Sequence, residues 1–197
     1  MSITPFKDKK LYDTYDSTRE PQYGVLSLPV SKGLFQVVQT EVKRQLTQRL
    51  DYDKGHTVEK EGDNLRRVDV FRIYEEDDVI RPIIKDLTVQ ANSVFNYKIS
   101  RIQDLQLLRY RQGDYYKVHS DVANGLASTR KISFTWLMNT NFEGGDMTII
   151  NSTDVYTVQK STDVVTFFTP FFNHEVKEVV AGTRIAIVGW IAGDSWR

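Results

Sequence analysis

Hydrophobic residues recur at helical spacing in two segments of the N-terminal half of the chain. In residues 31–50 apolar side chains lie three and four positions apart, and Ser31 is suited to cap the first turn. Residues 75–95 repeat this spacing behind an acidic first turn, where Pro82 is tolerated because the missing N–H group would have no helical partner. We therefore predict two amphipathic helices, with apolar positions at Leu34, Val37, Val38, Val42, Leu46, Ile80, Ile83, Ile84, Leu87, Ala91 and Val94.

From about residue 99 onward the pattern changes to short apolar or alternating runs, most of them separated by glycine or proline. Runs of this kind are typical of β-strands. Two similar runs lie earlier, at residues 23–30 and 67–74, whereas residues 1–22 and 51–64 are polar and indicate irregular and loop structure. The strands predicted in the C-terminal part are residues 105–110, 132–138, 147–150, 155–158, 164–168, 174–180 and 184–191.

This arrangement of many short strands indicates a β-sandwich or barrel. The fold class we expect is mainly β (α+β), with the two N-terminal helices packed on one outer face of the β-body. A chain of 197 residues fits a single domain with a substantial core. Within it, residues 1–98 would form a supporting region of helices and strands, and residues 99–192 would form the β-core.

Composition and charge exclude several classes of function. The 26 basic and 26 acidic residues cancel, and no basic cluster grows into a stripe, so we expect no nucleic acid partner. The absence of cysteine excludes disulfides, thiolate zinc sites, iron–sulfur clusters and thiol nucleophiles. The first residues are polar and no apolar run reaches membrane length, so we expect a cytoplasmic protein without a membrane partner.

A candidate metal site is formed by His119-Ser120-Asp121 and His174. Residues i and i+2 of a strand point to the same side, so His119 and Asp121 can converge on one ion, and a jelly roll can bring His174 from another strand. Two imidazoles and one carboxylate leave the opposite face of the metal open, as in non-haem iron(II) sites that activate O2. Manganese or zinc would also suit these ligands. The alternative is a chance pattern in which each histidine makes only a local hydrogen bond.

Arg184 is a candidate for binding an organic carboxylate beside that metal. Residues 176–180 and 183–191 are predicted to form a hairpin around Ala181-Gly182, which would place Arg184 on the strand next to the one that carries His174, roughly 10 Å along it. Guanidinium matches a carboxylate in a bidentate fashion and stays charged. It would therefore suit the distal carboxylate of a five-carbon diacid that chelates the metal. The alternative is an exposed strand arginine.

Three blocks of residues carry a family resemblance in residues 105–192. They are Tyr110-x-x-Gly113-x-x-Tyr116-x-x-His119-x-Asp121; Arg130-x-Ile132-Ser133 with Leu137-x-Asn139 and Phe142-x-Gly144-Gly145-Asp146-Met147; and His174-x-Val176-x-x-Val179-x-x-Gly182-x-Arg184-x-Ala186-x-x-x-Trp190. In order and spacing they resemble the prolyl 4-hydroxylase-like, PKHD-type branch of the 2-oxoglutarate- and iron(II)-dependent oxygenases. One departure is Thr162-Asp163, where relatives commonly have a glycine.

The resemblance implies a double-stranded β-helix (jelly roll) with the N-terminal helices packed on one sheet. It implies that His119, Asp121 and His174 bind iron(II) and are catalytic. Arg184 would anchor the C5 carboxylate of 2-oxoglutarate, and Tyr110 would be a second donor to it. Tyr116 would support the substrate mouth, and Gly144-Gly145 would allow a tight strand connection.

The activity that the resemblance implies is hydroxylation of a substrate C–H bond by a dioxygenase. Iron(II) would be the metal, 2-oxoglutarate and O2 the cosubstrates, and ascorbate a candidate reductant; succinate and CO2 would be released. The expected substrate is a prolyl residue of a protein or peptide, with a free amino acid or another small molecule as the alternative. A non-catalytic jelly-roll module that binds metal is an alternative from a different class.

Overall fold

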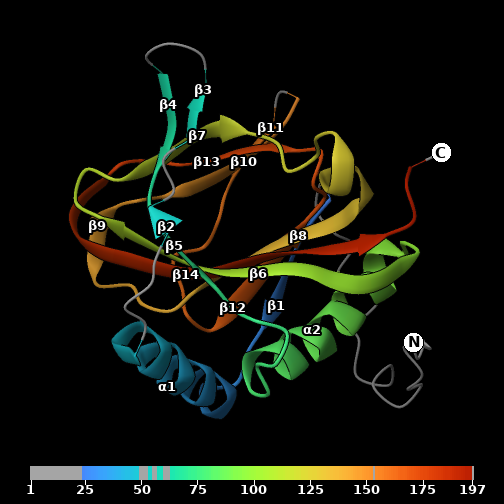
Figure 1. The fold of residues 1–197 in the computed structure, drawn as a ribbon, viewed down its shortest axis with the longest axis horizontal. Coiled ribbons are helices and arrows are strands. Elements are labelled where there is room, and N and C mark those ends of the chain that lie inside the picture. Colours follow the sequence, from blue (N-terminus) through green and yellow to red (C-terminus); the bar gives the residue numbers. More distant parts are fainter. Residues whose placement is uncertain (1–23, 49–52, 55–56, 60–62, 153, 197) are drawn as a thin grey trace.

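Two antiparallel β-sheets make up most of the computed structural model, which describes residues 24–48, 53–54, 57–59, 63–152 and 154–196 (Figure 1). The larger sheet has the strand order β1-β12-β8-β14-β6-β5-β2, and β9 also pairs with β14. These strands are β1 (Val25–Pro29), β12 (Val164–Phe168), β8 (Arg130–Leu137), β14 (Val179–Gly193), β6 (Ile99–Arg111), β5 (Asp69–Arg72), β2 (Asp53–Lys54) and β9 (Phe142–Gly144).

The smaller sheet has the order β11-β10-β13-β7-β4-β3. Its strands are β11 (Asp154–Thr157), β10 (Met147–Asn151), β13 (Asn173–Val176), β7 (Tyr115–His119), β4 (Asp63–Arg67) and β3 (Thr57–Glu59). Buried side chains from both sheets pack together, among them Val70 and Leu108 from the larger sheet and Ile149 and Val176 from the smaller one. The predicted mainly β jelly roll is therefore confirmed.

The outer face of the larger sheet is covered by α1 (Lys32–Gln48) and α2 (Ile80–Phe95), as Figure 1 shows. Alternation along the long strands explains this packing. In β6, Leu105 and Leu107 contact the cluster that includes the helices, whereas Leu108 and Tyr110 face the other sheet. The sequence thus gives each long strand one face for the helices and one face for the space between the sheets.

Helix ends follow local hydrogen bonding. Ser31 caps α1 as predicted, because its hydroxyl accepts a hydrogen bond from the Leu34 N–H at 3.3 Å. The second helix begins later than residue 75. Asp77 Oδ1 accepts hydrogen bonds from the N–H groups of Val79 and Ile80, so the acidic segment precedes the helix and caps it. At the other end Asn96 adopts the left-handed conformation (φ 53°).

Most predicted strands are present, and β12 has the predicted bounds. The predicted loop at residues 51–64 is wrong in part, because β2, β3 and the start of β4 fall within it. Residues 1–22, predicted to be irregular, lie outside the described residues. No helix in the described part of the chain, including the short 3-10 helix at Gly125–Thr129, has the length and apolar character needed to cross a membrane.

Candidate active site

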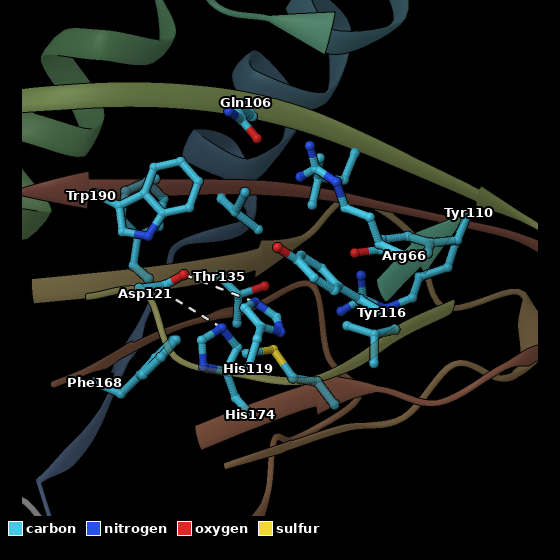
Figure 2. A pocket seen from close by; sticks show the side chains of 17 residues that line it. Arg66, Gln106, Tyr110, Tyr116, His119, Asp121, Thr135, Phe168, His174 and Trp190 are labelled. Atoms are coloured by element: carbon cyan, nitrogen blue, oxygen red, sulfur yellow. Dashed lines mark ion pairs between the residues drawn. The ribbon is translucent and has the colours of Figure 1, made fainter. Parts of the chain in front are cut away.

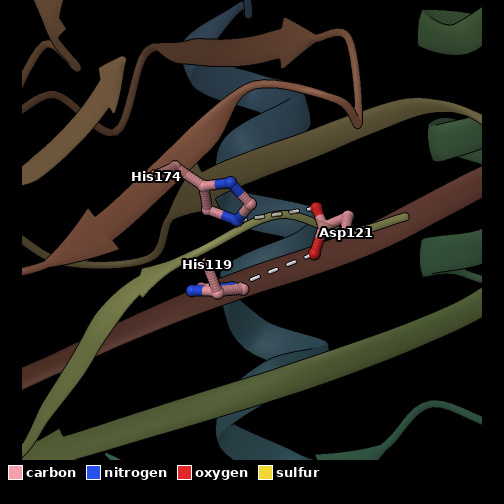
Figure 3. A group of neighbouring side chains, drawn as sticks. All are labelled: His119, Asp121 and His174. Atoms are coloured by element: carbon pink, nitrogen blue, oxygen red, sulfur yellow. Dashed lines mark ion pairs between the residues drawn. The ribbon is translucent and has the colours of Figure 1, made fainter. Parts of the chain in front are cut away.

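The three predicted metal ligands meet between two neighbouring strands of the smaller sheet. His119 ends β7, and its cross-strand partner on β13 is His174, which brings the two imidazole centroids to 4.2 Å. Asp121 lies beyond the end of β7 and not, as predicted, on the same strand as His119, and its N–H donates a hydrogen bond to the Pro170 carbonyl at 3.0 Å. One ligand atom from each of the three residues lies within 4.8 Å of the other two (Figure 3). The structure therefore brings together the residues that the sequence singled out.

Hydrogen bonds set which nitrogen of each histidine faces the carboxylate. Nδ1 of His119 lies 2.8 Å from the Lys117 carbonyl, and Nδ1 of His174 lies 3.1 Å from the Phe172 carbonyl. A carbonyl can only accept, so each Nδ1 carries a proton, and Nε2 is the nitrogen of each ring that is placed to bind a metal. The Nε2 atoms lie 3.9 Å and 3.5 Å from the two oxygens of Asp121.

The charges of the three side chains suit a divalent cation. Burial, followed by the neighbouring His174, lowers the pKa of His119 to about 4, so this imidazole is neutral near pH 7. Asp121 is buried, and its Oδ2 accepts a hydrogen bond from the Ser133 hydroxyl at 2.6 Å. Two imidazole nitrogens and one oriented carboxylate are a ligand set for iron(II), manganese or zinc.

Ser133 and Arg130 are supporting residues whose roles the sequence reasoning missed. The Arg130 guanidinium donates to the Asp121 carbonyl at 2.9 Å and stacks on the Trp190 ring, with 3.9 Å between its central carbon and the ring centroid. Both residues belong to the second block of the resemblance, but only the fold shows that they hold Asp121. A serine between the apolar residues Ile132 and Phe134 was the available signal.

Arg184 and Tyr110 are direct cross-strand partners on β14 and β6. Both are almost fully buried, with 2% and 1% of their surface exposed, and the Arg184 guanidinium carbon lies 5.2 Å from the centre of the tyrosine ring. Gly145 makes room for this arginine, because a Cβ at that position would lie 3.2 Å from Arg184 Cδ. The predicted proximity of Arg184 and Tyr110 is thus present.

The predicted route by which Arg184 reaches the site is wrong. There is no hairpin around Ala181-Gly182, because β14 runs continuously from Val179 to Gly193 and the chain turns earlier, between β13 and β14. These two strands belong to different sheets. Arg184 therefore approaches the metal ligands from the facing sheet and not from the strand next to His174.

Burial leaves Arg184 short of partners. Its Nε atom is buried without a hydrogen bond, and no ion pair of Arg184 occurs among the residues that the structure describes. Burial lowers the pKa of Arg184, and Tyr110 and Asp146 act in the opposite direction. Burial also raises the pKa of Tyr110, which stays a neutral hydroxyl group. A buried cation in this state is suited to an anionic ligand.

One pocket is lined by the three predicted metal ligands and by Arg184. Figure 2 shows this pocket, with His119, Asp121, His174 and Tyr110 labelled. It encloses about 510 Å³, its open mouth included. Tyr116 stacks on His119 with the ring centroids 3.6 Å apart and an angle of 11° between the planes. Burial raises the pKa of Tyr116, while Arg66 acts in the opposite direction. The polar residues of the lining are Arg66, Gln106, Tyr110, Tyr116, His119, Asp121, Thr135, His174, Arg184 and Trp190.

Comparison with known proteins connects this geometry to a family. Residues 105–192 match the model of the 2OG-Fe(II) oxygenase superfamily, and all five predicted site residues lie inside the match. The C-terminal part of the chain is therefore similar to this superfamily. A PKHD-type hydroxylase from Idiomarina loihiensis is 31% identical over 87 residues, which are 42% of this chain and 39% of that relative. The resemblance to the PKHD-type branch is confirmed, although the chain spans only 39% to 51% of the length of the curated relatives it matches.

Solved structures of the oxygenase superfamily have the same fold. A Pseudomonas putida prolyl-4-hydroxylase is similar with a TM-score of 0.72 and 14% identity, over 88% of this chain and 95% of that one. A Trichoplax adhaerens prolyl hydroxylase was solved with a peptide fragment of a hypoxia inducible factor. It is similar with a TM-score of 0.67 and 21% identity, over 87% of this chain and 84% of that one. At these identities the similarity establishes the jelly-roll architecture and nothing finer.

Proposed function

We propose that this chain is a 2-oxoglutarate- and iron(II)-dependent dioxygenase that hydroxylates a C–H bond of its substrate. The observation that carries the proposal is one pocket with two parts: three metal-ligand atoms within 4.8 Å of one another, and a buried arginine without an ion pair in the described structure. Iron(II) would bind to Nε2 of His119, Nε2 of His174 and the Asp121 carboxylate. The match of residues 105–192 to the model of the oxygenase superfamily supports this choice of metal.

The residues of this chain fit 2-oxoglutarate as well. Arg184 would pair with its C5 carboxylate through two parallel N–H donors, and the Tyr110 hydroxyl would donate to the same group. This pairing would give the buried Arg184 Nε a hydrogen-bond acceptor. It would also offset the free energy cost of burying the guanidinium charge. When bound, iron(II) and 2-oxoglutarate would activate O2, which is the oxidant; one oxygen atom would convert 2-oxoglutarate to succinate and CO2, and the other would enter the substrate C–H bond.

The protein's own contribution is orientation and exclusion of water. The carbonyls of Lys117 and Phe172 hold the imidazoles in the ligating tautomer, and Ser133 holds the carboxylate. The apolar pocket walls, including Met147 and Phe168, would limit water around a bound metal. Ascorbate would act as an external reductant.

Two substrate classes are open to this site: a prolyl residue in a protein or peptide, and a free amino acid or another small molecule. The names of similar proteins, PKHD-type hydroxylase and prolyl-4-hydroxylase, favour the first class. The test is to incubate the iron-loaded protein with 2-oxoglutarate, O2 and a panel of prolyl peptides and free amino acids. Succinate is measured, and each panel member is examined by mass spectrometry for a gain of 16 Da. Hydroxylated prolyl peptides would support the proposal. Succinate formation with gains only on free amino acids would reject the prolyl peptide.

A further inference from the structure

A second arginine, Arg66, lines the same pocket as the metal ligands and Arg184. It lies on β4, where it is the cross-strand partner of Tyr116 on β7. The Arg66 guanidinium carbon lies 5.5 Å from the centre of the Tyr116 ring, which in turn stacks on His119. The fold therefore places a second guanidinium one side chain away from a metal ligand.

The neighbouring Arg67 shows what an ordinary surface arginine does on this strand. Successive strand residues point to opposite faces, and the Arg67 side chain is 59% exposed and pairs with Asp114 at 3.2 Å. Arg66 is half-buried, its Nε atom is fully covered without a hydrogen bond, and no ion pair of Arg66 occurs in the described ranges. A covered cation without an acidic partner is suited to a ligand that supplies one.

Other buried polar atoms of the pocket are also hydrogen-bond donors without an acceptor among the described residues. Four pocket residues have a buried polar atom that lacks a hydrogen bond in the described structure, and each of these atoms can donate. They are Arg66 Nε, Arg184 Nε, Trp190 Nε1 and Thr135 Oγ1. Arg184 lies opposite Tyr110, whereas Trp190 lies six residues further along β14. Donors therefore remain available beyond those assigned to 2-oxoglutarate.

Charge balance leads to the same conclusion. The lining has two arginines and one carboxylate, Asp121, which is oriented by Ser133 and faces both histidines. A divalent cation and the dianion 2-oxoglutarate would cancel each other. The loaded pocket would keep one excess positive charge, which belongs to Arg66.

We propose that Arg66 binds a carboxylate of the substrate, and that the substrate is a small molecule with a free carboxylate, such as an amino acid. This inference rests on the proposed function, because it assigns Arg184 to 2-oxoglutarate. A guanidinium binds a carboxylate through parallel hydrogen bonds and so fixes orientation as well as position. An internal residue of a peptide has no backbone carboxylate to offer. Arg66 thus favours the small-molecule alternative over the prolyl peptide.

The test uses protein loaded with Mn²⁺, which prevents turnover, and saturated with 2-oxoglutarate. The probes are N-acetyl-L-proline and N-acetyl-L-prolinamide, which differ only in the carboxylate. Enhancement of their proton relaxation in NMR reports binding near the metal. We expect the acid to bind about tenfold more tightly than the amide, as a charge-assisted pair would give. Equal enhancement of the two probes, including no enhancement of either, would overturn the proposal.

Variants separate Arg66 from the rest of the pocket. Arg66→Gln should abolish the preference for the acid, Arg66→Lys should keep part of it, and the matched control Arg67→Gln should keep all of it. Relaxation of 2-oxoglutarate itself is measured in the same samples. If 2-oxoglutarate does not approach the metal in the unaltered protein, the proposed function fails. If it does, and Arg66→Gln leaves the acid preference intact or removes 2-oxoglutarate instead, the assignment of Arg66 fails.

Discussion

Replacing Arg184 by methionine should have opposite effects on the free and the ligand-bound protein. The side chain is 2% exposed and has no ion pair in the described structure, so without a ligand it carries a desolvated charge. Methionine fills a similar volume without that charge. We therefore expect Arg184→Met to raise the melting temperature of the protein without 2-oxoglutarate. The same change removes the partner of the C5 carboxylate.

The magnitude for the ligand-bound protein follows from mass action. A ligand at 100 times its Kd stabilises the folded state by about 2.7 kcal/mol, which is about 5–10 °C for a chain of this size. Leaving a buried carboxylate unpaired costs about 3–5 kcal/mol, or at least a hundredfold in Kd. At the same ligand concentration the stabilisation of Arg184→Met would then fall to about 0.4 kcal/mol, which is about 1 °C.

The assay is thermal unfolding of the Mn²⁺-loaded protein with and without 2-oxoglutarate, for the unaltered chain, Arg184→Met and Arg184→Lys. The lysine variant keeps the charge and loses the planar fork, so it should respond to 2-oxoglutarate more weakly than the unaltered chain. A 2-oxoglutarate response of Arg184→Met as large as that of the unaltered chain would refute the assignment of this residue.

Three further predictions concern the metal ligands and the core. Ser133→Ala should weaken Mn²⁺ binding about tenfold, because Asp121 loses its 2.6 Å hydrogen bond; calorimetry that finds unchanged affinity would contradict this role. The pKa of His119 is about 4, below the value for an unfolded histidine, so the unfolded chain binds more protons and stability is lost as the pH falls from about 6.5 toward 4. Urea unfolding in the presence of a chelator should therefore show that the free energy of unfolding falls more between pH 7 and pH 5 for the unaltered chain than for His119→Gln. Equal decreases in the two proteins would count against a buried neutral imidazole at position 119. Gly189→Ala should destabilise the fold by about 1–3 kcal/mol, because the new Cβ would lie 2.5 Å from Leu105 Cδ2. An unchanged urea midpoint for Gly189→Ala would show that β14 and β6 separate more easily at this position than the structure indicates.

The elements with strong local signals were predictable from the sequence. Both helices follow from apolar spacing, and Ser31 marks the start of the first one. The strand over residues 164–168 follows from an apolar run that only Thr166 interrupts. The metal ligands depended on more than local pattern, because His119 and His174 meet only through the pairing of β7 with β13. That these residues belong to one site was predictable from the order and spacing of the three motif blocks.

The hairpin at Ala181-Gly182 shows where local patterns mislead. Glycine usually marks a turn, but Gly182 has a φ of +78° within β14 and lies against β9. A Cβ there would come within 2.8 Å of the Asn141 carbonyl. The glycine permits a close strand approach beside an irregularity in pairing, which a sequence pattern does not distinguish from a turn.

Arg66 illustrates a different difficulty. The strand that carries it reads DNLRR, with no alternation of apolar and polar residues to show which side chain points inward. Arg66 and Arg67 look equivalent in the sequence, and only pairing with β7 separates the pocket arginine from the exposed one. Adjacent charged residues on such a strand therefore give no information about a site until the register is known.

The most direct measurement is an anaerobic titration of the metal-free protein with iron(II) in the presence of 2-oxoglutarate, followed by visible absorption. A keto acid that chelates iron(II) gives a weak charge-transfer band. The account predicts that this band saturates at one iron per chain and is absent in Asp121→Ala and His174→Ala. No band in the unaltered protein, or the same band in both variants, would contradict it.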